Sequence, residues 1–134
     1  MNTRAVASAY LLLQGVACLA WWVLLEVSVT FRGRFELLGD PRVLDSFRLT
    51  DLLLIFGASL IAAWLVMRRS RWALPAATFV LGSMVYATGL VIALTDDGLW
   101  AAPGPVAMLV GCLGTLVAVA LIARDQSGRS RGSS

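Results

Sequence analysis

The sequence contains no histidine and no lysine, and cysteine occurs only at positions 18 and 112. Without imidazole, the chain cannot bind haem, zinc or chlorophyll-type pigments through histidine, and two thiolates cannot complete a structural zinc site. The motifs G-x-x-x-x-G-K-[ST], G-x-S-x-G and H-E-x-x-H are also absent. We therefore expect no metal and no cofactor. A carboxylate-based active site is the one catalytic option that this composition leaves.

Charged residues are scarce as well. They make up 14% of the 134 residues, against 59% hydrophobic residues, and the mean hydropathy is +0.82. A soluble domain has roughly a quarter of its residues charged, because its surface must be coated with polar groups. All eleven basic residues are arginines that flank apolar stretches. This placement is typical of lipid-headgroup contacts, so we expect membrane lipids as partners and no nucleic acid.

Four apolar stretches are long enough to cross a bilayer, which takes about 20 helical residues. We predict spans at residues 5–27, 50–67, 72–95 and 105–123. The first could be read as a signal peptide, but its apolar run continues through Leu25, which favours a span. The fold class is thus an all-α integral membrane protein, a four-transmembrane-helix bundle over residues 1–124. Residues 125–134 are rich in Ser, Gly and Arg, and we predict a disordered cytoplasmic tail.

The arginines also predict an orientation, because cytoplasmic loops carry the excess of positive charge. Seven arginines lie in the N-terminal segment, the second loop and the tail, and four lie in the first loop. We therefore expect both termini in the cytoplasm. Arginine without lysine, together with abundant Ala, Leu, Val and Gly, indicates a GC-rich bacterial genome and hence a bacterial inner membrane.

The first loop, residues 30–50, alternates aromatic and cationic side chains. Asp40 followed by Pro41 is a favourable helix start, and Val43, Leu44 and Phe47 would then share one face. We predict a short interfacial helix here, lying on the outer membrane surface.

Charged groups gather where the first two spans meet this loop. The candidate site is an outer-face polar cluster, whose members are Glu26, Arg32, Arg48, Asp51 and Tyr86. A purely structural interpretation is that Asp51 helps to cap the second span after Thr50 and that Glu26 pairs with a first-loop arginine. The alternative is a binding vestibule open to the outer face.

Within the spans, Gln14 lies nearest the midplane, and its amide needs a hydrogen-bond partner. Ser59 and Thr115 lie at a suitable depth to provide one. Cys18 and Cys112 lie at similar depths and could face each other, either as packing residues or as a redox pair.

Three functions remain open on these residues. The first is a non-catalytic accessory or interaction subunit that binds another membrane protein or itself. The second is a small-molecule or lipid carrier with an outward-facing polar vestibule. The third is a lipid-modifying membrane enzyme. No residue pattern identifies a substrate.

Overall fold

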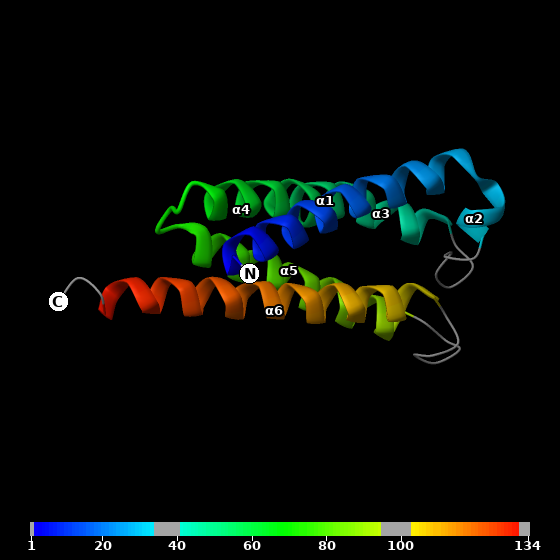
Figure 1. Cartoon of the computed structure of the whole chain (residues 1–134). Coiled ribbons are helices and arrows are strands. Elements are labelled where there is room, and N and C mark those ends of the chain that lie inside the picture. The colour runs from blue at the N-terminus through cyan, green and yellow to red at the C-terminus, as the bar shows by residue number, and fades with distance from the viewer. Residues whose placement is uncertain (1, 34–40, 95–102, 132–134) are drawn as a thin grey trace.

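The computed structural model describes residues 2–33, 41–94 and 103–131, all of them in helices or short connections. The elements, in chain order, are α1 (Thr3–Val27), α2 (Val29–Gly33), α3 (Pro41–Asp51), the π-helix η1 (Leu52–Gly57), α4 (Ala58–Met67), α5 (Ala73–Ala93) and α6 (Pro103–Arg131). Because α3, η1 and α4 follow one another without a break, the bundle has four long helices, which run side by side (Figure 1).

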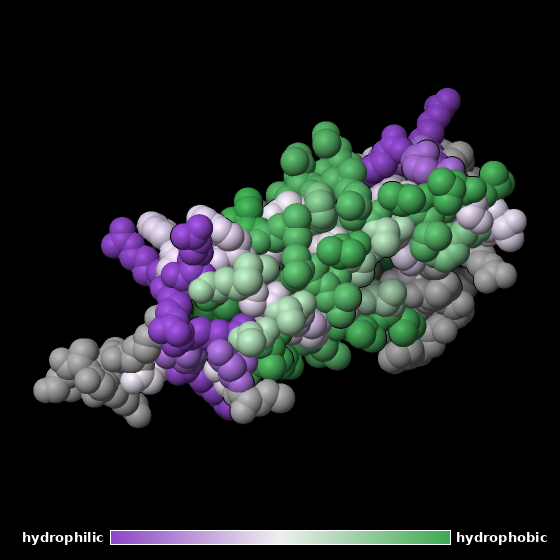
Figure 2. Space-filling model, turned by 45° about the horizontal axis from the view of Figure 1, so that its top comes forward, coloured by the Kyte–Doolittle hydropathy of each residue, from purple (hydrophilic) through white to green (hydrophobic). Residues whose placement is uncertain are grey.

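All four long helices are long and apolar enough to cross a membrane. In the most apolar 18-residue stretch of each long helix, only 17–33% of the residues are buried inside the bundle. Most of the apolar surface therefore faces outward. Figure 2 shows the result on one face, where an apolar belt lies between hydrophilic side chains at both ends. A surface of this kind is stable in hydrocarbon rather than water. The chain is therefore a small polytopic membrane protein, and the predicted four-helix fold is confirmed.

The second long helix begins earlier than its apolar residues indicate. It runs from Arg42 to Met67, 26 residues, whereas the sequence predicts a span at 50–67 preceded by a separate surface helix. Pro41 does begin a helix, but no glycine or proline interrupts the chain before Gly57, so the helix continues into the bilayer. The short helix between the first two spans is α2 instead, at Val29–Gly33.

The last helix is also longer than predicted. Residues 125–131 continue α6, although the sequence predicts a disordered segment from Asp125 onward, and residues 132–134 lie outside the described part. Ser127 supports this extension, because its hydroxyl donates to the carbonyl of Ala123 at 3.0 Å. At 1.5 Å per residue the 29-residue helix is about 43 Å long, so its last turns extend beyond a roughly 30 Å hydrocarbon core.

The helices pack closely because small residues lie at their contacts. A Cβ atom added at Gly15 would lie 3.2 Å from the carbonyl oxygen of Phe56, so the backbones of α1 and η1 nearly touch. Alanines supply much of the buried core, including Ala7, Ala62, Ala77 and Ala118. Association in lipid depends on this kind of close packing, because hydrocarbon supplies no hydrophobic driving force between helices.

The turn between α4 and α5 holds its backbone in a strained conformation. Arg69 has a φ of 55°, and its N–H and that of Ser70 donate to the carbonyls of Val66 and Leu65. These two bonds form a Schellman motif, in which glycine is the usual left-handed residue. An arginine in this conformation costs about 1–2 kcal/mol. The turn nevertheless places Arg69 at the end of the bundle, beside α1 and α6.

Candidate functional site

Two opposite ends of the bundle carry its charged groups. We call the end that holds Thr3, Met67, Ala73 and Arg124 the terminal end. The end that holds Val27, Pro41 and Leu94 is the loop end. The predicted polar cluster belongs to the loop end.

Two ion pairs connect the short helices at the loop end. Arg48 of α3 pairs with Glu26 of α1, and Arg32 of α2 pairs with Asp45 of α3 at 2.8 Å. Both pairs are partly exposed, so each contributes less than about 1 kcal/mol. Their geometric effect is larger, because together they attach α2 and α3 to the end of α1. Glu26 thus has the first-loop arginine partner that the sequence indicates.

Asp51 lies one helical turn deeper than Arg48 and has a different environment. Its side chain is 8% exposed, and its Oδ2 atom accepts a hydrogen bond from the indole Nε1 of Trp22 at 3.3 Å. The structural interpretation of Asp51 as a cap of the second span is wrong. The helix begins ten residues earlier, at Pro41, and Asp51 makes no capping hydrogen bond. A carboxylate in mid-helix is free to contact a neighbouring helix instead.

Apolar side chains surround this contact. Trp22, Leu25 and Leu44 form a buried cluster between α1 and α3, against which four further hydrophobic residues of the loop end pack: Trp21, Phe31, Phe47 and Leu52. The rings of Trp21 and Phe31 meet edge to face at 5.4 Å. The indole that bonds to Asp51 is therefore part of an apolar cluster of aromatic and leucine side chains.

Cys18 packs against this cluster on the side that faces the terminal end. Its thiol lies 3.7 Å from the backbone carbonyl oxygen of Asp51, at the point where the chain changes from α-helix to the π-helix η1. Neither Cys18 nor Cys112 is in a disulfide, so both are reduced thiols that pack against the core. This arrangement matches their interpretation as packing residues.

Tyr86 does not join the other members of the predicted cluster. It lies on α5, its side chain is 68% exposed, and its hydroxyl makes no hydrogen bond to any residue that the structure describes. The residues that sequence reasoning missed are Trp22 and Cys18. A signal for them exists, because Cys18, Trp22 and Glu26 are spaced four apart and so share one face of α1.

Gln14 forms the polar centre of the bundle. Its amide Nε2 lies 3.5 Å from the hydroxyl of Ser59, and its Oε1 accepts a 2.7 Å hydrogen bond from Thr115. The partners expected from depth alone are therefore confirmed, and they join α1 to α4 and α6. Nearby, the hydroxyl of Tyr10 donates to the carbonyl of Gly111 at 2.7 Å. Every buried side-chain nitrogen or oxygen in the described segments has a partner.

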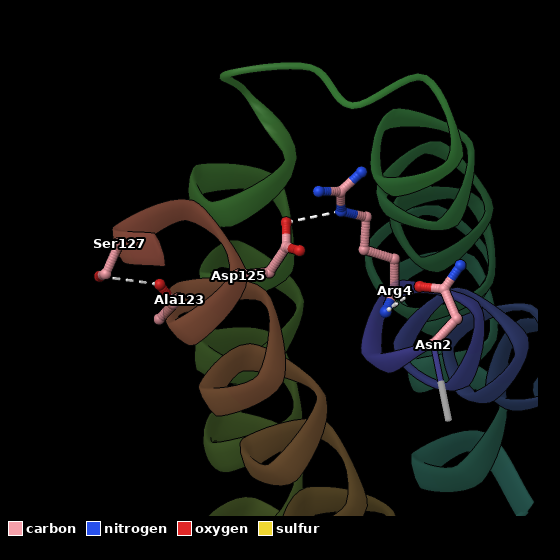
Figure 3. A network of polar contacts seen from close by, with 5 residues as sticks. All are labelled: Asn2, Arg4, Ala123, Asp125 and Ser127. Carbon is pink, nitrogen blue, oxygen red and sulfur yellow. Dashed lines mark hydrogen bonds and ion pairs between the residues drawn. The ribbon is translucent and has the colours of Figure 1, made fainter. Parts of the chain in front are cut away.

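The terminal end carries a third ion pair. Arg4 of α1 reaches across to Asp125 of α6 at 2.6 Å, as Figure 3 shows. A shallow notch beside this pair is lined by Val66, Arg69, Ser70, Ala73, Ile122 and Gln126. At the same end Arg68 and Arg71 lie over the rings of Trp64 and Trp72, at 5.3 and 5.5 Å from the ring centroids. Cationic side chains stacked on tryptophan are typical of the headgroup layer.

Comparisons with known proteins identify no relative: no family model, no curated protein and no solved structure matches this chain. Across residues 2–33, 41–94 and 103–131, no three metal-ligating side chains come together.

Proposed function

We propose that this protein is a non-catalytic membrane protein that associates with a second copy of itself through the lipid-facing side of α5. The observation that carries the proposal is Tyr86. In the bilayer interior a phenolic hydroxyl without a partner is unfavourable, because hydrocarbon cannot accept its hydrogen bond. Tyr86 exposes 68% of its side chain there and bonds to none of the described residues.

The surface around Tyr86 would admit another helix. Gly82 and Gly89 lie one turn to either side, both are exposed, and no atom lies within 4 Å of a Cβ built at either position. Small residues at this spacing let helix backbones approach closely in lipid. Gly82 lies beside the midpoint of α5, so two copies of this helix crossing there would form a symmetric contact along most of the span.

The other polar groups of the bundle support a non-catalytic role. The carboxylates of Glu26 and Asp125 are held by arginines, and the amide of Gln14 is held by two hydroxyl groups. These contacts join helices to one another and are each satisfied within the chain. Tyr86 is the polar side chain that a partner would satisfy.

Cysteine cross-linking in native membranes tests the interface. In a chain with Cys18→Ala and Cys112→Ala, we expect Gly82→Cys to give a disulfide-linked dimer on mild oxidation. The reason is that the residues at position 82 of the two copies would be adjacent where the helices cross. The matched control is Ala120→Cys, which adds a thiol to the exposed face of α6. Equal cross-linking of both variants would indicate random collision and contradict the proposal, as would a cross-link to a different protein.

A larger side chain at position 82 should disrupt the association. We expect Gly82→Leu to weaken dimerisation in detergent or bilayers by roughly tenfold or more, about 1.4 kcal/mol, because leucine separates the two backbones. Ala120→Leu adds similar bulk on α6 and should leave the dimer fraction unchanged. Analytical ultracentrifugation or single-molecule photobleaching would measure the difference.

We also propose that both termini lie in the cytoplasm of a bacterium, at its inner membrane. Arg4, Arg68, Arg71 and Arg124 belong to one end of the bundle, which supports this orientation. A reporter fused after Ser134 or inserted at Ser70 is expected to be cytoplasmic, and one inserted at Gly98 to be outside. Cytoplasmic activity of the Gly98 reporter would overturn the orientation and leave the four spans intact.

A further inference from the structure

The carboxyl group of Asp51 is buried between α3 and α1, and an interface on α5 does not explain why it lies there. We propose that Asp51 is a proton-binding site: as a neutral carboxylic acid it holds α3 against α1 through Trp22, and loss of the proton opens this contact. The ligand is a hydrogen ion taken up from the loop-end side. The proposal does not depend on self-association, and the two can fail separately.

The first argument is the set of partners of Asp51. Asp51 is 8% exposed, and within the described segments its carboxyl group accepts one hydrogen bond, from the uncharged indole of Trp22. No arginine in the described segments lies within ion-pair distance of it. An ionised carboxylate in an apolar environment without a counter-ion is strongly disfavoured, and such a group neutralises instead.

The second argument is that the nearby charges in the described segments are already paired. Glu26 of α1 and Arg48 of α3 neutralise each other one turn above Asp51, and Arg32 of α2 pairs with Asp45. Cys18 below is a thiol that contacts the backbone of Asp51 rather than its carboxyl group. On α5, which packs against η1, the titratable side chain is Tyr86, and it faces outward. None of these groups offsets a negative charge on Asp51.

The third argument is the helix geometry. The chain changes from α-helix to π-helix directly after Asp51, over Leu52–Gly57. A π-helix has more residues per turn, so it changes the direction in which α3 side chains face relative to those of α4. At this junction Asp51 contacts Trp22 on α1. Single π-helical turns are uncommon and often accompany functional sites.

Together these features make a contact that depends on protonation. A neutral acid can accept the indole N–H and remain beside the apolar cluster to which Trp22 belongs. A carboxylate would have to reach water by moving α3 away from α1, or draw Arg48 from Glu26 across one turn of helix. In both cases the loop end loosens as the pH rises.

Carbodiimide labelling in native membranes tests the protonation state. Dicyclohexylcarbodiimide partitions into the bilayer and reacts with a protonated acid. The acid proton moves to a reagent nitrogen, the carboxyl oxygen bonds to the central carbon, and the adduct rearranges to a stable N-acylurea without a leaving group. At about pH 7 we expect Asp51 to be labelled roughly tenfold faster than Glu26 or Asp125, whose carboxylates are ion-paired. Mass spectrometry of peptides locates the adduct.

A second measurement covers the case in which the reagent does not reach the site. Asn has the shape of the neutral acid, so Asp51→Asn should melt like wild type at about pH 6 and above wild type at about pH 9. The sign follows from the proposal: stability from a bound proton is present at low pH and lost as the proton leaves. Glu26→Gln, which removes an ion pair, serves as the matched control.

Two results would overturn the proposal. One is preferential labelling of Glu26 or Asp125 with Asp51 unmodified. The other is the same dependence of melting temperature on pH for wild type and Asp51→Asn. In either case Asp51 would be an ionised structural residue.

Discussion

Replacing Gly114 with leucine is expected to force α6 away from α1 and to destabilise the bundle by about 3 kcal/mol. A Cβ atom at Gly114 would overlap the hydroxyl and two ring carbons of Tyr10. The tyrosine ring cannot easily turn away, because its hydroxyl donates to the carbonyl of Gly111 on the same helix. Thermal unfolding in a mild detergent, followed by circular dichroism, would measure the loss.

Gly111 offers a matched comparison three residues away. A Cβ atom there would meet the terminal methyl of Met84 at 2.7 Å, and this flexible side chain can move aside. We therefore expect Gly111→Ala to cost less than about 1 kcal/mol. Adding Tyr10→Ala to Gly114→Leu should recover part of the loss, because it removes the obstructing ring. A loss for Gly114→Ala no larger than that for Gly111→Ala would contradict this account of the α1–α6 contact.

The general architecture could be predicted from the sequence because membrane insertion depends on local hydropathy. The four spans, and the partners of Gln14, follow from apolar length and depth alone. The start of the second helix could not be found in this way. Arg42, Asp45 and Arg48 lower the hydropathy of residues 41–51, but a helix ends where a residue breaks it, not where hydropathy falls.

The candidate site was harder to predict because depth does not determine which way a side chain faces. The sequence places Glu26, Asp51 and Tyr86 together only by their distance from the outer boundary. In the structure Glu26 lies at the rim, Asp51 faces α1, and Tyr86 faces outward from α5. The π-helix that directly follows Asp51 could not be predicted either, because no hydropathy pattern marks a π-helix.

Five residues of α1 that make polar contacts nevertheless share one face of the helix. At 3.6 residues per turn Arg4, Ser8, Cys18, Trp22 and Glu26 fall on this face, and each contacts another helix. Ser8, for example, donates to the carbonyl of Ala63 on α4. This row extends from the ion pair at the terminal end to the one at the loop end.

Trp22 is the residue of this row whose loss should matter most at the loop end. It is 3% exposed, it packs with Leu25 and Leu44, and it donates the hydrogen bond that Asp51 accepts. Trp22→Ala would leave a cavity between α1 and α3, with an expected loss of roughly 3–5 kcal/mol. Trp22→Phe keeps most of the ring and removes the N–H, so it should cost only about 1 kcal/mol.

The neighbouring tryptophan serves as the control for Trp22. Trp21 is only partly buried and contacts Phe31 at the edge of the cluster, so Trp21→Ala should have a clearly smaller effect. Maleimide labelling provides an independent measurement, because Cys18 lies one turn below Trp22 and Cys112 lies on α6. In Trp22→Ala the labelling rate of Cys18 should rise several-fold while that of Cys112 stays constant. Equal losses for Trp21→Ala and Trp22→Ala, or an unchanged Cys18 rate, would show that the aromatic cluster does not hold α3 against α1.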